Sequence, residues 1–181
     1  MDSEGQMRFW GTGDGQDGHD AIEHIAALPW CTGKVAMLGN SWLAISQWFI
    51  AAERPKHLAC IAPLEGVSDP LREQLRRGGI PERQFWRELG GMLCGLSPFL
   101  LFSKRFGLLI LIFVVWAGRN GMEDMVGMAQ ETELTSDYWE DKRARIDRIE
   151  VPAYILASYS TMLHTVGSFR GYEDIPHDAK W

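Results

Sequence analysis

The sequence predicts an α/β protein whose core is a parallel β-sheet. Residues 35–38 and 57–63 are short apolar runs with the length and composition of buried parallel strands. The residues between these runs carry apolar side chains at helical spacing, and residues 151–158 return to strand character. A helix between two apolar strands is the pattern of a βαβ unit, so we expect a parallel sheet with helices packed on it.

Length and composition are those of an ordinary globular protein. The chain has 181 residues, of which 46% are hydrophobic and 23% are charged, enough for one domain or a piece of a larger one. Its formal net charge is −6, and Lys and Arg occur in no run longer than a pair. This balance argues against nucleic acid or an anionic membrane as the main partner.

The N-terminal part is predicted to form a loop followed by a helix. Residues 11–15 are rich in glycine, and without a preceding strand they do not match a phosphate-binding loop. We therefore expect a plain loop there. The apolar residues Ile22, Ile25 and Leu28 recur at helical spacing, which predicts a helix that begins at Asp17 or Asp20 and ends before Pro29.

The central stretch, residues 34–46, is predicted to be a strand, a sharp turn and a helix, with Ser41 at the turn. A serine there has its hydroxyl clear of the sheet, and the helix N-terminus behind it offers N–H groups to an oxyanion. The usual G-x-S-x-G pattern is incomplete because Leu43 stands where its second glycine would be. Since Gly and Ser are also common connectors, the pattern alone leaves a structural turn and a catalytic nucleophile both open.

The helix after Ser41 should turn its apolar side chains inward and end before Pro55. The buried side chains that we expect on it are Ile45, Trp48, Phe49 and Ala52.

We expect three regions: a core part at residues 1–68, a helical insertion at 69–148, and a return to the core at 149–181. Within the insertion, residues 96–116 are unusually apolar, but Lys104 and Arg105 interrupt them, and a spanning helix needs about 20 consecutive apolar residues. A buried helix or strand is therefore expected there. Residues 137–148 mix both charges and predict a solvated amphipathic helix.

The end of the chain predicts a strand at residues 151–158 and a helix at 167–172. In open α/β sheets catalytic groups lie just past the carboxyl ends of strands, yet the loop at 159–164 contains no acid. The three cysteines form neither a metal-ligand spacing nor a disulfide framework. No secretory signal is visible at the N-terminus, so a cytoplasmic location is expected.

Seven segments in the same order resemble one family, the X-Pro dipeptidyl-peptidase and cocaine-esterase group of serine hydrolases. They are DGHDAIE at 17–23, LPWC at 28–31, GKVAMLGNSW at 33–42, APLEG at 62–66, RGGIP at 77–81, YWEDK at 138–142 and VPAY at 151–154. The matches cover most of the chain outside residues 96–116. Collinear matches of this kind are far more specific than the serine turn alone.

The resemblance implies an α/β-hydrolase core with a helical cap insertion. Members cleave esters, amides or peptides by acylating a serine, with an aspartate and a histidine as helpers and without a cofactor or metal. Ser41 matches the nucleophile, and the backbone N–H of Trp42 matches one oxyanion donor. The second donor of the family, a tyrosine, would lie upstream of Met1.

The sequence also departs from the family pattern. Thr161 stands where the family usually has its acid, and the family histidine would fall beyond Trp181. His164 does not match the catalytic position. We therefore expect a truncated member that supplies only Ser41 of the triad and has little or no turnover.

Three hypotheses follow from the sequence. The first is a serine hydrolase acting on esters or X-Pro peptides through Ser41. The second is a non-catalytic fragment or pseudoenzyme of that family. The third is a membrane-associated or interaction protein that uses the apolar segment 96–116. A separate hypothesis concerns the origin of this segment: it is foreign to the fold, for example an untranslated part of the gene that is read through into the protein.

Overall fold

The computed structural model describes residues 8–82, 123, 125–132 and 136–181. The chain forms two compact units, one of Met1–Phe9 with Glu82–Glu133 and one of Trp10–Pro81 with Leu134–Trp181. In the first unit the described residues include helix α6 (Met125–Glu131), and the Phe9 N–H donates to Glu123 Oε2 at 2.8 Å. The apolar segment 96–116 lies outside the described residues, as does most of the expected insertion.

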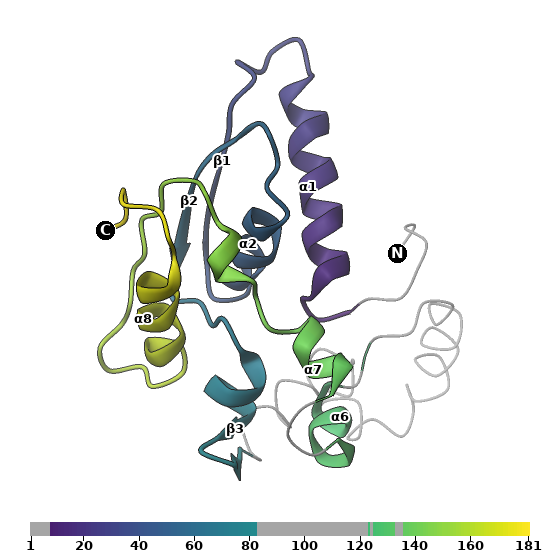
Figure 1. The fold of residues 1–181 in the computed structure, drawn as a ribbon, viewed down its shortest axis with the longest axis vertical. Coiled ribbons are helices and arrows are strands. Elements are labelled where there is room, and N and C mark those ends of the chain that lie inside the picture. The colour runs from purple at the N-terminus through teal and green to yellow at the C-terminus, as the bar shows by residue number, and fades with distance from the viewer. Residues whose placement is uncertain (1–7, 83–122, 124, 133–135) are drawn as a thin grey trace, which may run out of the picture. The chain divides into compact units, whose positions relative to one another are not determined.

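The second unit is built on a parallel strand pair. Strand β1 (Val35–Asn40) and strand β2 (Leu58–Leu64) pair in parallel, with Met37 opposite Ile61, and helix α2 (Trp42–Ala52) connects them (Figure 1). This is the βαβ unit that the sequence predicts. The predicted α/β class is confirmed.

Two further segments extend this sheet by single bridges. Ile61 and Leu64 of β2 bridge in parallel to Ala153 and Leu156, and Ala153 bridges in turn to Lys180. The predicted strand at 151–158 therefore lies beside β2, in register with its carboxyl end. The loops that follow β1, β2 and residue 156 consequently meet at one end of the sheet.

Helix α2 packs its apolar face into the core. Ile45, Trp48, Phe49 and Ala52 are all buried, as the sequence predicts, and Trp48 has no exposed surface. Burial on this scale, at about 25 cal/mol per Å² of apolar surface, is what fixes the helix that carries the serine turn. Helix α8 (Thr165–Asp174) also agrees with its prediction and extends it at both ends.

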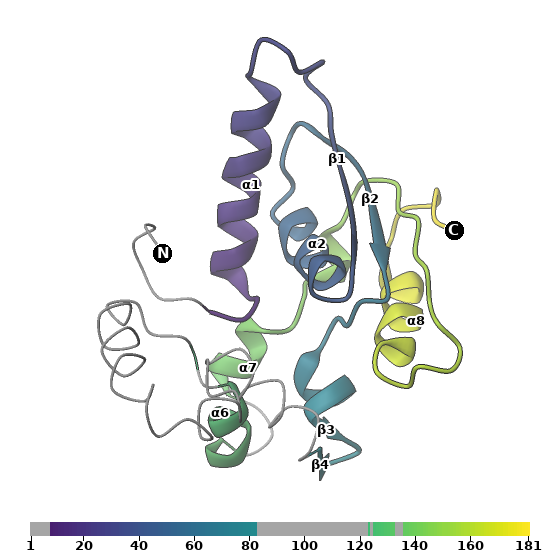
Figure 2. The same cartoon turned by 180° about the vertical axis from the view of Figure 1, so that it is seen from behind.

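Helix α1 (Thr12–Ala26) begins five residues before Asp17 and eight before Asp20, the two predicted starts, so the loop expected from residue 12 onward is wrong. The helix packs against α2 (Figure 2). A Cβ at Gly15 would lie 2.9 Å from the Phe49 carbonyl oxygen, so the glycine permits a close approach of the two helices. The Thr12 N–H at the first turn donates to the Asp141 carboxylate at 3.1 Å.

Beyond β2 the chain forms short elements. A π-helical turn η1 (Leu71–Leu75) leads into a hairpin of β3 (Arg76–Arg77) and β4 (Ile80–Pro81). The expected solvated helix at 137–148 is wrong: helix α7 (Asp137–Asp141) is followed by a turn and by a 3₁₀ helix η2 (Ile146–Arg148). The reason is burial, because Trp139 and Lys142 are 1% and 2% exposed and Lys142 Nζ lies over the Tyr138 ring.

Candidate active site

Ser41 forms the whole turn between β1 and α2. Strand β1 ends at Asn40 and α2 begins at Trp42, and Ser41 has a φ of +56°, a conformation uncommon outside glycine. Its N–H donates to the Leu64 carbonyl at 3.0 Å, and the Asn40 side chain donates to the same oxygen at 3.1 Å. The end of β2 therefore holds the strained turn in place.

The turn tolerates Leu43 because the residue facing it is a glycine. A Cβ at Gly39 would lie 2.4 Å from Leu43 Cβ. The Leu43 side chain itself is 64% exposed and leaves the core. The first glycine of the incomplete G-x-S-x-G pattern thus makes the second one unnecessary for the backbone fold.

His164 lies against Ser41, although 123 residues separate them in the chain. Its Nε2 is 3.2 Å from Ser41 Oγ, and its side chain is buried immediately before α8. The structure thus places a histidine of this chain beside Ser41, where the sequence alone predicts none. The histidine is not the one that the family resemblance places beyond Trp181.

Glu65 lies on the other side of the imidazole. Its Oε2 is 3.6 Å from His164 Nδ1, which is within ion-pair range but longer than a hydrogen bond. Glu65 follows β2 directly, has a φ of +60°, and donates its N–H to the Leu156 carbonyl at 2.8 Å. Ser41, His164 and Glu65 therefore form a serine–imidazole–carboxylate series.

Burial sets the protonation of His164. Desolvation lowers the pKa of this imidazole below its ordinary value of 6.5, the charge of Glu65 raises it, and the cation of Arg77 lowers it. The lowering dominates, so the imidazole is neutral near pH 7 and its ring nitrogen can accept a proton. A hydroxyl next to a neutral imidazole is the pairing required for an activated nucleophile.

The other predicted site residues lie as follows. Trp42 is the first residue of α2, where the N–H groups of a helix have no acceptor within the helix, and its ring centroid is 4.9 Å from that of Trp10. Its role as oxyanion donor stays a prediction. Thr161, at the position of the family acid, is exposed.

Sequence reasoning missed Glu65 and His164 as site residues. Glu65 stands just past a predicted strand, where a surface role is the default expectation, and His164 does not match the catalytic position of the family. Groups past the carboxyl ends of parallel strands meet at one edge of a sheet, and this rule holds for every strand. Applied to every strand and to every titratable residue, the same rule selects Glu65 after β2 and His164 after the 153–156 segment. The signal was present in the strand order.

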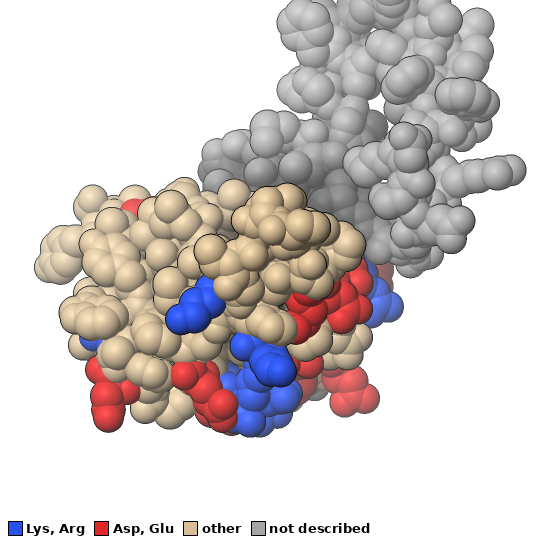
Figure 3. All heavy atoms as spheres, turned by 90° about the horizontal axis from the view of Figure 1, so that it is seen from above, with Lys and Arg blue, Asp and Glu red and all other residues tan. Residues whose placement is uncertain are grey.

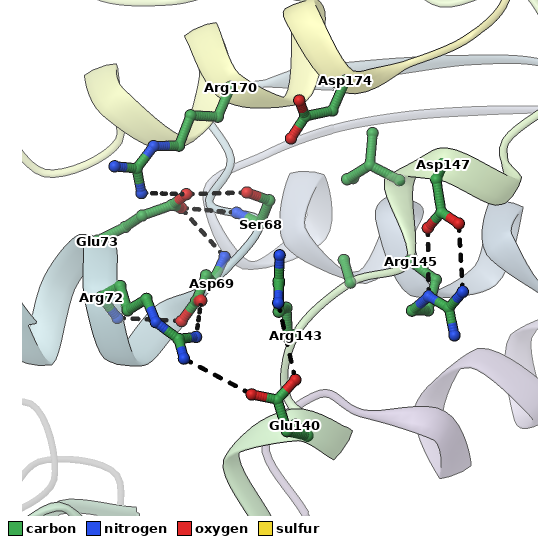
Figure 4. Close-up of a pocket in the computed structure, with 12 residues that line it drawn as sticks. Ser68, Asp69, Arg72, Glu73, Glu140, Arg143, Arg145, Asp147, Arg170 and Asp174 are labelled. Carbon is green, nitrogen blue, oxygen red and sulfur yellow. Dashed lines mark hydrogen bonds and ion pairs between the residues drawn. The ribbon is translucent and has the colours of Figure 1, made fainter. Parts of the chain in front are cut away.

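A separate pocket of about 880 Å³ lies beside η1, α7, η2 and α8 (Figure 4). Its charged lining consists of four arginines and five carboxylates, namely Arg72, Arg143, Arg145, Arg170, Asp69, Glu73, Glu140, Asp147 and Asp174. Each of these arginines is in an ion pair with one of the carboxylates. Four of the five carboxylates of the pocket wall are thus compensated by an arginine of the same wall.

On the face in Figure 3 most of the described surface is uncharged, and acidic and basic side chains lie next to one another along its lower edge. Among the described residues, no three His, Cys, Asp or Glu side chains form a group able to hold a metal ion. None of the helices that the structure describes has both the length and the apolar character to cross a bilayer.

Comparison with known proteins identifies relatives of the chain. A family model described as X-Pro dipeptidyl-peptidase (S15 family) matches residues 1–97. Proteins named "Putative serine esterase" from Mycobacterium bovis and Mycobacterium tuberculosis are each 31% identical over 71 residues, which is 39% of this chain and 11% of theirs.

The fold has solved counterparts. Two crystal structures of a CocE/NonD family hydrolase from Staphylococcus aureus match all of this chain at 30% identity with a TM-score of 0.83. The chain covers 29% of one and 30% of the other. It therefore has the α/β-hydrolase-like fold of these proteins over the part that it spans, and, since the family model matches more than half of it, the chain belongs to the X-Pro dipeptidyl-peptidase (S15) family.

Proposed function

We propose that this chain is a serine hydrolase that forms an acyl-enzyme on Ser41, with His164 as general base and Glu65 as the group that orients it. The observation that carries the proposal is the 3.2 Å contact between Ser41 Oγ and His164 Nε2 on a strained turn between strand and helix. Membership of a family of hydrolases supports it independently. So does the buried, neutral state of the imidazole.

In the first step Ser41 Oγ attacks the carbonyl carbon of the substrate while its proton passes to His164 Nε2. A neutral imidazole at hydrogen-bond distance accepts this proton and becomes an imidazolium. The negative side chain of Glu65, 3.6 Å from Nδ1, stabilises that cation and requires only a small movement to accept an N–H bond from it. The apo distance does not exclude this role, because catalytic hydrogen bonds often tighten only with substrate bound.

The tetrahedral intermediate needs hydrogen-bond donors for its oxyanion. The position of Trp42 at the start of α2 supports its backbone N–H as one donor, since the first N–H groups of a helix point away from the helix and carry its positive dipole end. Collapse of the intermediate expels the alcohol or amine, which takes the proton from His164 Nε2. Water then attacks the acyl ester by the same route and frees Ser41.

The substrate class is an ester or an X-Pro peptide bond. The esterase names of the two mycobacterial relatives support the first, and the description of the family model supports the second. Both reactions use the same acyl-serine chemistry. They differ in the leaving group, which is an alcohol for the ester and an amine for the peptide.

The second candidate is a family member with the same fold but negligible turnover. One observation favours it: His164 Nδ1 is buried without a hydrogen-bond partner, because Glu65 stays at 3.6 Å. A buried imidazole whose second nitrogen is not fixed has no preferred tautomer, and a wrong tautomer removes the base from Ser41.

A fluorophosphonate probe separates the two candidates, because it reacts with activated serines. We expect peptide mapping to find the label on Ser41 of the full chain, and we expect both Ser41→Ala and His164→Gln to abolish it. Ser160→Ala is the matched control, since Ser160 is an exposed serine in a loop and should change nothing. A labelled wild type supports the hydrolase.

Absence of label on a correctly folded wild-type chain contradicts the hydrolase proposal and favours the inactive member. Substrate class is then tested on the active chain with p-nitrophenyl esters of short acids and with X-Pro p-nitroanilides. Release of nitrophenolate without nitroaniline assigns the esterase, and release of nitroaniline assigns the peptidase.

A further inference from the structure

The segment Arg76 to Pro81 forms a tight hairpin whose first strand ends at Arg77. Arg77 pairs with Ile80 in an antiparallel ladder, and the two residues between them, Gly78 and Gly79, have φ values of +58° and +84°. A two-residue turn with both φ values positive matches the twist of the flanking strands and strongly favours glycine. The tight turn therefore fixes the backbone from which the Arg77 side chain extends.

The Arg77 guanidinium bridges two parts of the chain. Its Nε donates to the carbonyl of Glu73, at 2.5 Å, and its Nη2 donates to the carbonyls of Met162 and Leu163. The buried Gln74 side chain donates to the Leu163 carbonyl as well, at 3.2 Å. Two side chains from one short stretch thus hold the two carbonyls that come directly before His164.

The loop that carries His164 needs such support. Met162 is 70% exposed and has a φ of +59°, which is an unfavourable conformation for a residue with a long side chain. Few apolar contacts stabilise residues 159–162, which are exposed throughout. Donors to the backbone are therefore what keeps the loop, and with it the imidazole, at its distance from Ser41.

The same stretch also holds the loop that carries Glu65. The buried Glu73 carboxylate accepts the N–H groups of Ser68 and Asp69, at 2.8 and 3.1 Å, and pairs with Arg170 of α8 (Figure 4). Ser68 lies three residues after Glu65, and Arg170 lies six residues after His164. Residues 73–77 are therefore linked to the loop after Glu65, to the loop before His164 and to helix α8 after it.

We propose that Arg77 and Gln74 are positioning residues for His164, which hold the carbonyls of Met162 and Leu163 so that the imidazole stays in contact with Ser41. This inference rests on the proposed function for its catalytic consequence. Its structural content, that these two side chains fix the loop before His164, is independent of turnover.

The test uses the full chain and three substitutions in the pair Arg77 and Gln74, which we call the clamp. Arg77→Met removes the guanidinium and its charge, Arg77→Lys keeps the charge but replaces the planar fork with one ammonium, and Gln74→Met removes only the amide. Arg54→Met is the matched control: Arg54 also donates to a backbone carbonyl, that of Arg148, but follows the opposite end of α2 from Ser41.

Three measurements are made on each variant. They are the rate of fluorophosphonate labelling at Ser41, the hydrogen exchange of the Leu163 and His164 amides, and the NMR titration of the His164 ring. The charged groups that act on this titration are Glu65 after β2 and Arg77 on β3. A cooperative thermal unfolding transition in each variant, at a temperature close to that of the wild type, excludes a global loss of structure.

All three clamp variants should accelerate exchange of the two amides and slow labelling, by about a hundredfold for a displacement of the imidazole near 1 Å. Arg77→Met should raise the pKa of His164 more than the other two variants do, because it alone removes the cation. Arg54→Met should change none of the three measurements. Unchanged exchange and labelling in Arg77→Met and Gln74→Met, or equal changes in Arg54→Met, overturns the inference.

Failure of this inference differs from failure of the proposed function. If the wild type is not labelled at Ser41, the hydrolase proposal fails, while amide exchange and the His164 titration still decide whether the clamp exists. If the wild type is labelled and the clamp variants behave like it, the hydrolase proposal stands and the positioning role is wrong.

Discussion

The Nδ1 atom of His164 lies 3.6 Å from Oε2 of Glu65, in a buried position where this carboxylate is the nearby negative charge acting on the imidazole. The two residues come from different loops, one after β2 and one before α8. They meet because the 153–156 segment is bridged in parallel to β2, so that the carboxyl ends of both lie at one edge. The pair therefore follows from the strand order.

Glu65→Gln should lower the pKa of His164 further and slow labelling at Ser41. The charge of Glu65 raises that pKa, and its loss leaves burial and the Arg77 cation unopposed. We expect a loss of labelling of roughly tenfold, which corresponds to ~1.4 kcal/mol of lost imidazolium stabilisation. NMR titration of the ring and probe kinetics measure the two effects. Glu150→Gln, which removes an exposed carboxylate paired with Arg54, should alter neither.

Labelling of Ser41 should follow the deprotonation of His164. Because burial lowers the pKa of this imidazole, the rate should rise with pH and reach its plateau with a midpoint below 6.5. Rates measured from pH 4 to 8 under conditions where the chain stays folded, as judged by circular dichroism, provide the test. A midpoint above 6.5 would contradict a buried imidazole as the base.

The same titration affects folding with a definite sign. His164 has a lower pKa folded than unfolded, so between these two values the unfolded chain binds the proton first. The free energy of unfolding should therefore fall as the pH drops from 6.5 toward the pKa of the folded state. Below that pKa and above 6.5, His164 should no longer change it with pH. In His164→Gln the fall in this window should be smaller, as urea unfolding at several pH values will show.

The elements that the sequence predicts correctly are those set by local pattern. β1, α2 and β2 follow from the spacing of their apolar residues and from the prolines and glycines that end them. The turn at Ser41 follows from the order of these elements. The missed elements depend on distant partners. Nothing near Lys142 in the sequence indicates that its side chain is buried over the Tyr138 ring, and the predicted solvated helix fails for that reason.

The candidate site divides in the same way. Ser41 is identified from its neighbours in sequence, whereas its contact with His164 joins residues 123 positions apart. That contact requires the order of the strands and the conformation of the loop before α8. The glycine-rich start of α1 is a third case, since low helix propensity is overridden there by close packing against α2.

Two glycines of α1 should respond to alanine in opposite directions. Gly15→Ala places a Cβ 2.9 Å from the Phe49 carbonyl oxygen, and because that atom belongs to the backbone of α2 the helices must separate. We expect a loss of about 1–3 kcal/mol in the free energy of unfolding. Gly13→Ala is the matched control, with nothing within 4 Å of its Cβ, and should stabilise the chain by up to about 1 kcal/mol. Urea unfolding compares them, and equal effects would contradict close helix packing.

The relation between Gly39 and Leu43 leads to a rescue experiment at the serine turn. Gly39→Ala should distort the turn and slow labelling of Ser41, because the new Cβ would lie 2.4 Å from Leu43 Cβ. Leu43→Gly removes that atom, and since the Leu43 side chain is exposed its loss should cost only helix propensity, about 1 kcal/mol.

Gly39→Ala should therefore slow labelling less in the Leu43→Gly background than in the wild type. The rescue should be partial, because the backbone C and O of residue 43 stay 3.2 Å from the new Cβ. Leu43→Ala is the control that isolates the clashing atom, because alanine keeps the Cβ and should give no rescue. A positive coupling energy for glycine and none for alanine, from a double-mutant cycle of labelling rates and urea midpoints, is the expected result. Rescue by both residues would mean that the bulk of Leu43, and not the backbone approach at Gly39, controls the geometry of the turn.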